Sequence, residues 1–232
     1  MAYIEFDNVE KEYRGEVKVM AVRGCSFEIE KGEMVAILGQ SGAGKTTILN
    51  MLGGMDSPTG GRITVDGRDV SAMKNRGLVQ YRRQDIGFVF QFYNLIANLT
   101  AVENVELACQ LCHDAFDPED VMRDVGLADR MKSFPSQLSG GEQQRVSIAR
   151  AVAKNPKILL CDEPTGALDS ETGKKIIELL IKTCKRRKVT TIIVTHNSEI
   201  AKVCDKIIRI KNGAVDKIKI NENPLSPDEI EW

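Results

Sequence analysis

Gly39-Gln-Ser-Gly-Ala-Gly-Lys-Thr46 is the segment that most clearly indicates how this chain folds. It matches the pattern G-x-x-x-x-G-K-[ST] and lies between an apolar run, Met34 to Leu38, and a helical pattern that continues through Ile48 to Leu52. Glycines in such a loop let backbone N–H groups converge on phosphate oxygens, and the helix that follows adds positive potential at its N-terminus. The strand–loop–helix context predicts a P-loop core that holds a nucleoside triphosphate.

Individual residues of this loop have separate expected tasks. Lys45 is expected to bridge the β- and γ-phosphates, and the Thr46 hydroxyl is expected to coordinate Mg²⁺. The other residues are expected to surround the phosphates. The nucleotide-binding residues predicted here are Gly39, Ser41, Gly42, Ala43, Gly44, Lys45, Thr46 and Thr47.

A second apolar run, Ile158 to Cys161, ends in two acidic residues, Asp162 and Glu163. Parallel strands place ligands at their carboxyl ends, so a carboxylate at the end of a buried strand is well placed for catalysis. We expect Asp162 to hold Mg²⁺ through water. Glu163 is expected to orient and polarise the attacking water as a general base.

Two more apolar strands end in polar side chains. Gln91 follows Ile86 to Phe90, where it could reach the metal or the attacking water, and His196 follows Thr191 to Thr195, where it could hydrogen-bond the γ-phosphate. Alone, an amide or a histidine at a strand end is usually structural. Three apolar strands that each end in a group suited to the same phosphate favour a shared catalytic site.

A further anion site is predicted at the start of a helix, in Ser139-Gly-Gly-Glu142. Serine followed three residues later by glutamate is a capping-box pattern, and the free N–H groups of a helix start attract anions. One chain therefore has two phosphate-binding devices, neither of them duplicated. That combination fits a head-to-tail dimer in which each copy closes on the nucleotide of the other.

The patterning predicts an α/β protein with a mostly parallel sheet, an N-terminal antiparallel β subdomain and an inserted α-helical subdomain. In a single domain of residues 1–232, the core and its β subdomain span 1–91 and 158–220 and the helical subdomain spans 92–157. Residues 221–232 form a polar, Pro-punctuated tail that we expect to be loosely held. The expected strands and helices cover 3–6, 21–29, 34–38, 62–65, 86–90, 158–161, 171–187, 189–195, 207–210 and 215–220, with helix starts at Thr100, Pro118 and Ser139.

Composition excludes several classes of function. The 232 residues are 42% hydrophobic and 28% charged, as in globular proteins, and the net charge of −1 gives no electrostatic case for a nucleic-acid partner. The N-terminus lacks a basic region followed by an apolar one, so no secretion signal is expected. Since no segment has the roughly 18 to 20 consecutive apolar residues of a membrane span, we do not expect the polypeptide to cross a membrane by itself.

Two tempting motifs have ordinary interpretations. Cys109-Gln-Leu-Cys-His113 matches a covalent haem-attachment pattern, but it continues a helical repeat, and the export signal that haem attachment requires is not seen. We therefore expect these to be ordinary helix residues with reduced cysteines.

Lys185-Arg-Arg-Lys188 could be a lipid or nucleic-acid patch. It is short and sits at a helix end, so a solvated face that suits the helix dipole is favoured.

At this point the residues resemble an ATP-binding-cassette (ABC) ATPase over nearly the whole chain. Leu138-Ser-Gly-Gly-Glu-Gln-Gln-Arg-Val-Ser-Ile-Ala-Arg-Ala151 resembles the signature motif of that family, and Asp162-Glu-Pro-Thr-Gly-Ala-Leu-Asp169 resembles Walker B running into the D-loop. Gln91 and His196 fall where the family has its Q-loop and switch histidine. Ser147 stands where many relatives have alanine, a departure away from the chemistry.

The resemblance implies ATP and Mg²⁺ as cofactors and a second copy of the chain as partner. It implies that catalysis involves Lys45, Gln91, Glu163 and His196, and that Mg²⁺ is held by Thr46, Gln91 and Asp162. Tyr13 resembles the aromatic residue that stacks on adenine, with packing in the core as the alternative. The residues that would reach the partner's ATP in trans are Ser139, Gly140, Gly141, Glu142 and Asp169.

Within the family the chain looks most like the lipoprotein-release, macrolide-export and bacitracin-resistance group (LolD, MacB and BceA types). This implies ATP-driven export or mechanotransmission through a separate integral-membrane permease, with the chain at the cytoplasmic face of the membrane. Phe92-Tyr-Asn-Leu95 would line the groove that receives the permease, unless it only packs at the boundary of the helical subdomain. The rivals are a division-type regulator of cell-wall enzymes, a soluble ABC ATPase of translation or DNA repair, and a GTPase or small-molecule kinase.

Overall fold

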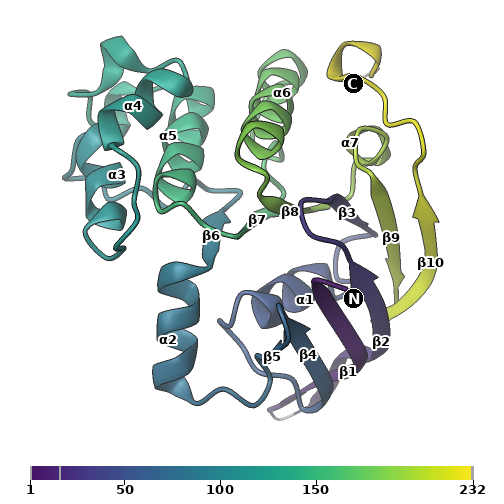
Figure 1. Ribbon diagram of the computed structural model, residues 1–232. Coiled ribbons are helices and arrows are strands. Elements are labelled where there is room, and N and C mark those ends of the chain that lie inside the picture. The colour runs from purple at the N-terminus through teal and green to yellow at the C-terminus, as the bar shows by residue number, and fades with distance from the viewer. Residues whose placement is uncertain (1, 16, 231–232) are drawn as a thin grey trace.

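The computed structural model describes residues 2–15 and 17–230, built around a six-stranded sheet (Figure 1). Its strand order is β10-β9-β3-β8-β7-β6, and all neighbours are parallel except β10, which pairs antiparallel with β9. The central strands are buried on both faces, as expected of a parallel sheet covered by helices. The strands are β3 Met34–Leu38, β6 Ile86–Val89, β7 Ile158–Asp162, β8 Thr190–Thr195, β9 Lys206–Lys211 and β10 Ala214–Ile220.

Alternate residues of this sheet enter two separate cores. On one face, Ala36 and Leu159 belong to a cluster with the helical insertion and with helices α6 (Ser170–Arg187) and α7 (Ser198–Ala201). On the other face, Ile37 and Leu160 pack with helix α1 (Lys45–Leu52) and the smaller sheet. The two cores follow from the two-residue period of a strand.

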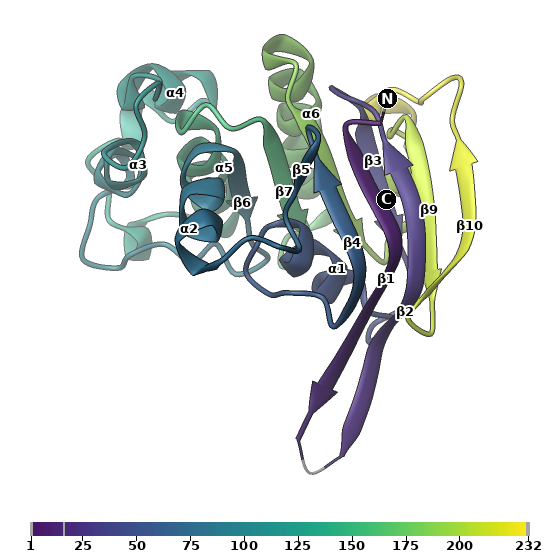
Figure 2. The ribbon, with the colours of Figure 1, turned by 60° about the horizontal axis from the view of Figure 1, so that its bottom comes forward.

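The smaller sheet is antiparallel, with the strand order β2-β1-β4-β5. Its turn at Asp66-Gly67 has positive φ at both residues, 51° and 72°, as a two-residue hairpin requires. The β1–β2 hairpin extends away from the body of the molecule (Figure 2). The strands are β1 Ile4–Arg14, β2 Lys18–Ile29, β4 Gly60–Val65 and β5 Arg68–Asp69. The expected antiparallel β subdomain is confirmed.

The expected helical insertion is confirmed between β6 and β7. Thr100 and Glu103 form the predicted capping box of α3, and Pro118 occupies the first turn of α4. A second capping box, between Ser139 and Glu142, opens α5. The helices are α3 Ala101–Cys109, α4 Pro118–Asp124 and α5 Gly140–Ala153, with short 3₁₀ turns η1 Ala128–Arg130 and η2 Pro135–Gln137.

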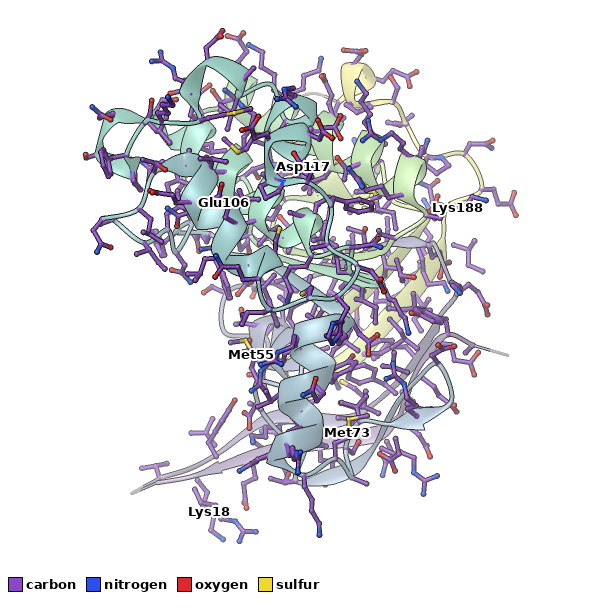
Figure 3. The ribbon with its side chains drawn as sticks, turned by 60° about the vertical axis from the view of Figure 1, so that its left-hand side comes forward. Lys18, Met55, Met73, Glu106, Asp117 and Lys188 are labelled. Atoms are coloured by element: carbon purple, nitrogen blue, oxygen red, sulfur yellow. The ribbon has the colours of Figure 1, made fainter. Side chains whose placement is uncertain are left out.

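Hydrophobic periodicity in the sequence did not predict helix α2, Asn75–Gln84, which lies beside the β subdomain (Figure 3). The helix buries only Leu78 and Tyr81, and the Tyr81 hydroxyl donates to the Leu52 carbonyl over 2.9 Å. So few apolar positions in a basic segment give a weak sequence signal.

The prediction of a loosely held tail is wrong as far as Ile230. The Asn221 amide donates to the Lys202 carbonyl over 2.8 Å, and Lys174 pairs with Asp228 at 3.2 Å. Ile230, 6% exposed, joins the core cluster, next to the 3₁₀ turn η3 Pro227–Glu229. One buried apolar side chain anchors a segment whose composition is otherwise polar. Residues 231–232 lie outside the described residues.

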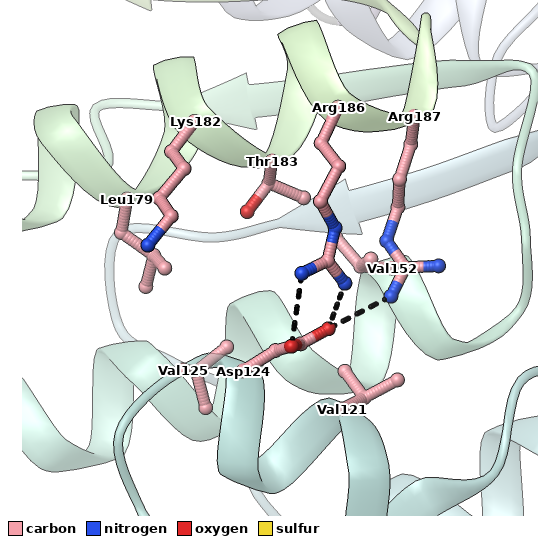
Figure 4. A pocket seen from close by; sticks show the side chains of 9 residues that line it. All are labelled: Val121, Asp124, Val125, Val152, Leu179, Lys182, Thr183, Arg186 and Arg187. Atoms are coloured by element: carbon pink, nitrogen blue, oxygen red, sulfur yellow. Dashed lines mark hydrogen bonds and ion pairs between the residues drawn. The ribbon is translucent and has the colours of Figure 1, made fainter.

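The basic end of α6 is not merely a solvated face. Arg186 and Arg187 both bond to the Asp124 carboxylate at the end of α4, across a small pocket (Figure 4). The Arg187 guanidinium also lies 3.8 Å from the centre of the Phe116 ring. These contacts tie the helical insertion to the core.

All six cysteines are free thiols, and α3 ends at Cys109, the first cysteine of the haem-like motif. Among residues 2–15 and 17–230, none of the helices combines the length and apolar character needed to cross a membrane.

Candidate functional site

The P-loop follows β3 and wraps back over the end of the sheet. Gly39 donates its N–H to the Thr195 carbonyl over 3.4 Å, which joins the loop to the end of β8. Gly44 has φ +98°, and a Cβ there would lie 2.4 Å from the Ala21 carbonyl oxygen. Only glycine fits this approach, and helix α1 begins at the next residue, Lys45.

Lys45 lies inside the loop and is only 7% exposed. Its ammonium donates to the carbonyls of Gly39 and Gln40 over 2.8 and 3.0 Å. Ala43 donates its N–H to the Gln40 carbonyl over 3.2 Å, while Ser41 and Gly42 are exposed. The loop therefore holds a buried cation beside exposed backbone at a helix start, an arrangement suited to a polyphosphate.

Two oxygen ligands meet beside the loop. The Thr46 hydroxyl donates to Asp162 Oδ1 over 3.2 Å, joining α1 to the end of β7. The pKa of Asp162 is raised, mainly because burial disfavours the charged carboxylate. The hydrogen bond from Thr46 and the charge of Lys45 act in the opposite direction, and the neighbouring Glu163 carboxylate adds to the rise. A hydroxyl and a half-buried carboxylate are donors that fit Mg²⁺, which usually takes one or two protein ligands together with phosphate and water.

Glu163 lies at the same edge and is held from β8. Its Oε1 is 2.9 Å from His196 Nδ1, and its Oε2 accepts a hydrogen bond from the Thr195 hydroxyl over 3.3 Å. Glu163 has φ +46°, an uncommon conformation for a non-glycine residue, and its N–H donates to the Val194 carbonyl over 2.9 Å. Strained backbone of this kind concentrates at functional sites.

Gln91 completes the row of strand ends. Its amide nitrogen lies close to Gly166. A Cβ placed on Gly166 would be 3.0 Å from this nitrogen and 3.4 Å from the Cβ of Glu163. The structure thus brings Gln91, Glu163 and His196 together, as the three strand ends predicted.

Tyr13 lies on the projecting hairpin and is 42% exposed, so the alternative of core packing is wrong. Its hydroxyl donates to Asp56 Oδ2 over 2.9 Å, and the Lys11 ammonium lies 5.0 Å from the ring centre. The pKa of Tyr13 is raised mainly by burial, against the influence of the Thr47 hydroxyl. The bond to Asp56 joins the hairpin to the segment that follows α1, the helix after the P-loop.

The residues expected to act in trans occupy two helix starts. Ser139 and Glu142 bond reciprocally, and Glu142 also meets Arg130 at 3.2 Å. Asp169 caps α6 by accepting the Thr172 N–H over 3.0 Å. In the described part of the chain, these acceptors bond locally rather than to residues of the P-loop.

Close packing explains the two glycines at the start of α5. A Cβ on Gly140 would lie 2.8 Å from the Tyr93 hydroxyl, and one on Gly141 would lie 2.4 Å from the Thr172 side chain. The start of α5 therefore fits between the segment after Gln91 and the start of α6.

Several residues of the site were missed from the sequence. Asp56 and Lys11 support Tyr13, the Thr195 hydroxyl supports Glu163, and Arg150 donates to the Tyr93 carbonyl over 2.8 Å. Thr195 could have been found, because it precedes His196 at a strand end. The others act through contacts distant in sequence, which carry no local signal.

The fold and the arrangement of the site agree with comparisons to known proteins. The family model described as ABC transporter matches residues 22–166. An uncharacterised ABC transporter ATP-binding protein of Thermotoga maritima is 48% identical over 210 residues, covering 88% of this chain and 89% of that protein. The macrolide export ATP-binding/permease protein MacB of Salmonella typhi is 45% identical, covering 98% of this chain but 35% of that protein.

A solved structure gives the same result. The dimeric, post-hydrolysis ATP-binding cassette MJ0796, bound to ADP and Pi, superposes with a TM-score of 0.87 at 39% identity and covers 95% of this chain and 99% of that one. This chain therefore belongs to the ABC transporter family, as an ATP-binding and ATP-hydrolysing cassette.

Proposed function

We propose that the chain is the ATPase subunit of a membrane transport complex of the LolD, MacB and BceA type. Two copies would bind Mg·ATP head to tail, and hydrolysis would drive export or mechanotransmission through a separate permease. The observation that carries this proposal is the hydrogen bond between Glu163 and His196 at the sheet edge beside the P-loop, with Gln91 and Glu163 both close to Gly166. The nucleotide-bound dimer of MJ0796 and the similarity to the macrolide exporter MacB support it.

In the proposed mechanism the loop residues 39–47 bind the phosphates of ATP, and Tyr13 stacks on its adenine. Lys45 contributes the positive charge for the β- and γ-phosphates. Thr46 and Asp162, with Gln91, would hold Mg²⁺. When bound, the ion would neutralise charge on the phosphate oxygens.

Glu163 is proposed as the general base. Its carboxylate accepts the proton of a water aimed at the γ-phosphorus, in a step that breaks the bond between that phosphorus and the bridging oxygen. His196 and the Thr195 hydroxyl hold the two carboxylate oxygens, at 2.9 and 3.3 Å, and so fix the direction of the base. His196 is exposed on its other side and would hydrogen-bond the γ-phosphate.

We further propose that the partner completes each site. The N–H groups at the start of α5, with Ser139, Gly140, Gly141 and Glu142, would face the γ-phosphate bound by the other copy, and Asp169 would lie at the same interface. Helix starts stabilise such charges.

We also propose that residues 1–91 and 158–220 form the core, residues 92–157 the helical subdomain and residues 221–232 the tail.

The surface after Gln91 is proposed as the permease contact. Phe92 is 72% exposed, and Tyr93 and Asn94 both have positive φ, 59° and 51°. Arg150 donates to the carbonyls of Tyr93 and Asn94 over 2.8 and 2.5 Å, which holds the turn in place. A large apolar side chain on a braced turn suits a protein contact. This contact would hold the chain at the cytoplasmic face of the membrane.

Affinity purification of Glu163→Gln from its native membranes, in detergent with Mg·ATP, tests the assignment. We expect mass spectrometry to identify a four-span permease with a large outer domain. The double variant Glu163→Gln/Phe92→Ser is the matched control, expected to dimerise but to lose the permease. Capture of soluble proteins alone would contradict the transporter assignment, and a permease associated with cell-wall hydrolases would identify the division-type alternative.

A further inference from the structure

Gln144 is a polar side chain buried in the middle of the protein. It lies on α5, is 0% exposed, and donates from Nε2 to the Pro164 carbonyl over 2.8 Å. Within residues 2–15 and 17–230 its Oε1 is buried without a partner, as is the hydroxyl of Ser147 one turn further along. Burying an amide whose oxygen has no hydrogen-bond partner destabilises the folded state, so packing alone does not explain the presence of Gln144 in the core.

The acceptor of this bond lies directly beside the proposed general base. Glu163 to Gly166 is a tight turn in which the Gly166 N–H donates to the Glu163 carbonyl over 3.0 Å. Pro164 is buried and has no N–H, so its carbonyl is the one backbone group through which it can be held. The orientation of the peptide after Pro164 also distinguishes the two common types of turn. The Gln144 bond therefore fixes the turn that carries Glu163.

The same part of α5 carries the helix start, where Gly140 packs against Tyr93 and Gly141 against Thr172. Gln144 lies little more than one turn from Ser139, and a helix of this kind moves as a unit. The hydrogen bond from Gln144 gives such a displacement a direct contact with Pro164. The helix connects the site expected to meet the partner's nucleotide to the chain's own Glu163.

We propose that Gln144 is a positioning residue for hydrolysis: its amide aligns Glu163 when α5 closes on the nucleotide of the partner. The proposal rests on the proposed function for the trans role of α5. It gives a physical route by which occupation of one ATP site sets the base of the other.

The first test compares Gln144→Met with Ser147→Ala in the purified full chain. Methionine keeps the length of the side chain, removes the donor and removes the unpaired acceptor, so the variant should fold. We expect a fall of about tenfold in kcat, the size of one buried hydrogen bond, with unchanged KM and unchanged ATP affinity of the monomer. A small fall in Tm is expected as well, because the buried Pro164 carbonyl loses its donor. Ser147→Ala, on the same buried face, should match the wild type.

Gln144→Glu is a second variant that tests the same hydrogen bond in case Gln144→Met folds poorly. In Gln144→Glu the protonated carboxyl can donate to the Pro164 carbonyl, whereas the ionised form cannot. We expect its kcat relative to the wild type to rise as the pH falls. A ratio that does not change with pH would contradict an aligning hydrogen bond.

The direction of the coupling is tested with mixed dimers of two differently tagged chains, one of them carrying Glu163→Gln. Single-turnover hydrolysis then comes from the chain that keeps Glu163. Gln144→Met in that chain should slow hydrolysis about tenfold, while the same change in the Glu163→Gln chain should leave it unaltered. An equal effect in both positions, or the reverse order, would overturn the proposal.

Different results would contradict the proposed function and the role of Gln144. If Glu163→Gln does not dimerise with Mg·ATP, the proposed function is contradicted. If it dimerises and Gln144→Met retains wild-type kcat, only the role of Gln144 is contradicted.

Discussion

The carboxylate of Glu163 and the imidazole of His196 are joined at 2.9 Å across the ends of two neighbouring strands. Their strands, β7 and β8, are parallel neighbours, so their carboxyl ends lie side by side. The bond uses one carboxylate oxygen, and Thr195 occupies the other. A carboxylate held through both oxygens keeps its direction before any substrate binds, and such preorganisation would lower the barrier to reaction in the proposed role of Glu163 as base.

Replacing Glu163 by glutamine should leave ATP binding intact but reduce turnover by about 10² to 10⁴ fold, since the amide cannot take the proton. The side chain has almost the same shape, so binding of the nucleotide should not suffer. Steady-state ATPase assays beside equilibrium binding of a fluorescent nucleotide would separate the two effects. Turnover at the wild-type rate would mean that another group is the base.

Lys45→Ala should weaken nucleotide binding. The change removes a cation that two loop carbonyls hold inside the P-loop. We expect the Kd for ATP to rise at least tenfold, as for the loss of a charge-assisted contact. Lys31→Ala is the control, because Lys31 is an exposed lysine on a different loop. An unchanged Kd for Lys45→Ala would exclude the assigned role.

Ser139→Arg should block dimer closure while leaving ATP binding to the monomer intact. The long cation would fill the space at the start of α5, where the proposal places the partner's γ-phosphate. Size-exclusion chromatography of the Glu163→Gln background with ATP would reveal the dimer. Ser226→Arg, at another capping box far along the chain, controls for the loss of a cap. The trans role would be wrong if Ser139→Arg abolished binding to the monomer.

Asp124→Asn should destabilise the junction between α4 and α6. Arg186 first, and then Arg187, hold the pKa of Asp124 below its usual value. A carboxyl with a lowered pKa stabilises the folded state above its unfolded pKa of about 3.9 and loses that contribution as the pH falls through the folded value.

For a partly exposed ion pair the effect is about 1 kcal/mol or less, or about 2–4 °C in Tm for a chain of this size. Thermal unfolding at pH 7 and at a series of lower pH values measures it, and the difference from wild type should shrink below pH 4 and vanish once the pH is below the lowered pKa of folded Asp124. Asp228→Asn, whose side chain is 84% exposed in its pair with Lys174, should have a smaller effect. A difference between Asp124→Asn and wild type that persists at low pH would contradict an ionic origin.

Local sequence patterns were enough to predict the nucleotide-binding core and to select the residues proposed for its chemistry. The P-loop, the capping boxes at Thr100 and Ser139, and the polar residues after apolar strands are local patterns, and each reflects a backbone requirement met within a few residues. Parallel strands share one carboxyl edge, so Gln91, Glu163 and His196 could be expected to converge.

Contacts between elements far apart in the chain could not be predicted and are seen only in the folded structure. Gln144 meets Pro164, Arg186 meets Asp124, and Ile230 enters the core through packing that no local pattern encodes. The composition of the tail and of the basic run suggested solvent exposure, but a single buried side chain or a distant carboxylate outweighed it. Burial and pairing depend on which surfaces meet, and that is settled when the whole chain folds.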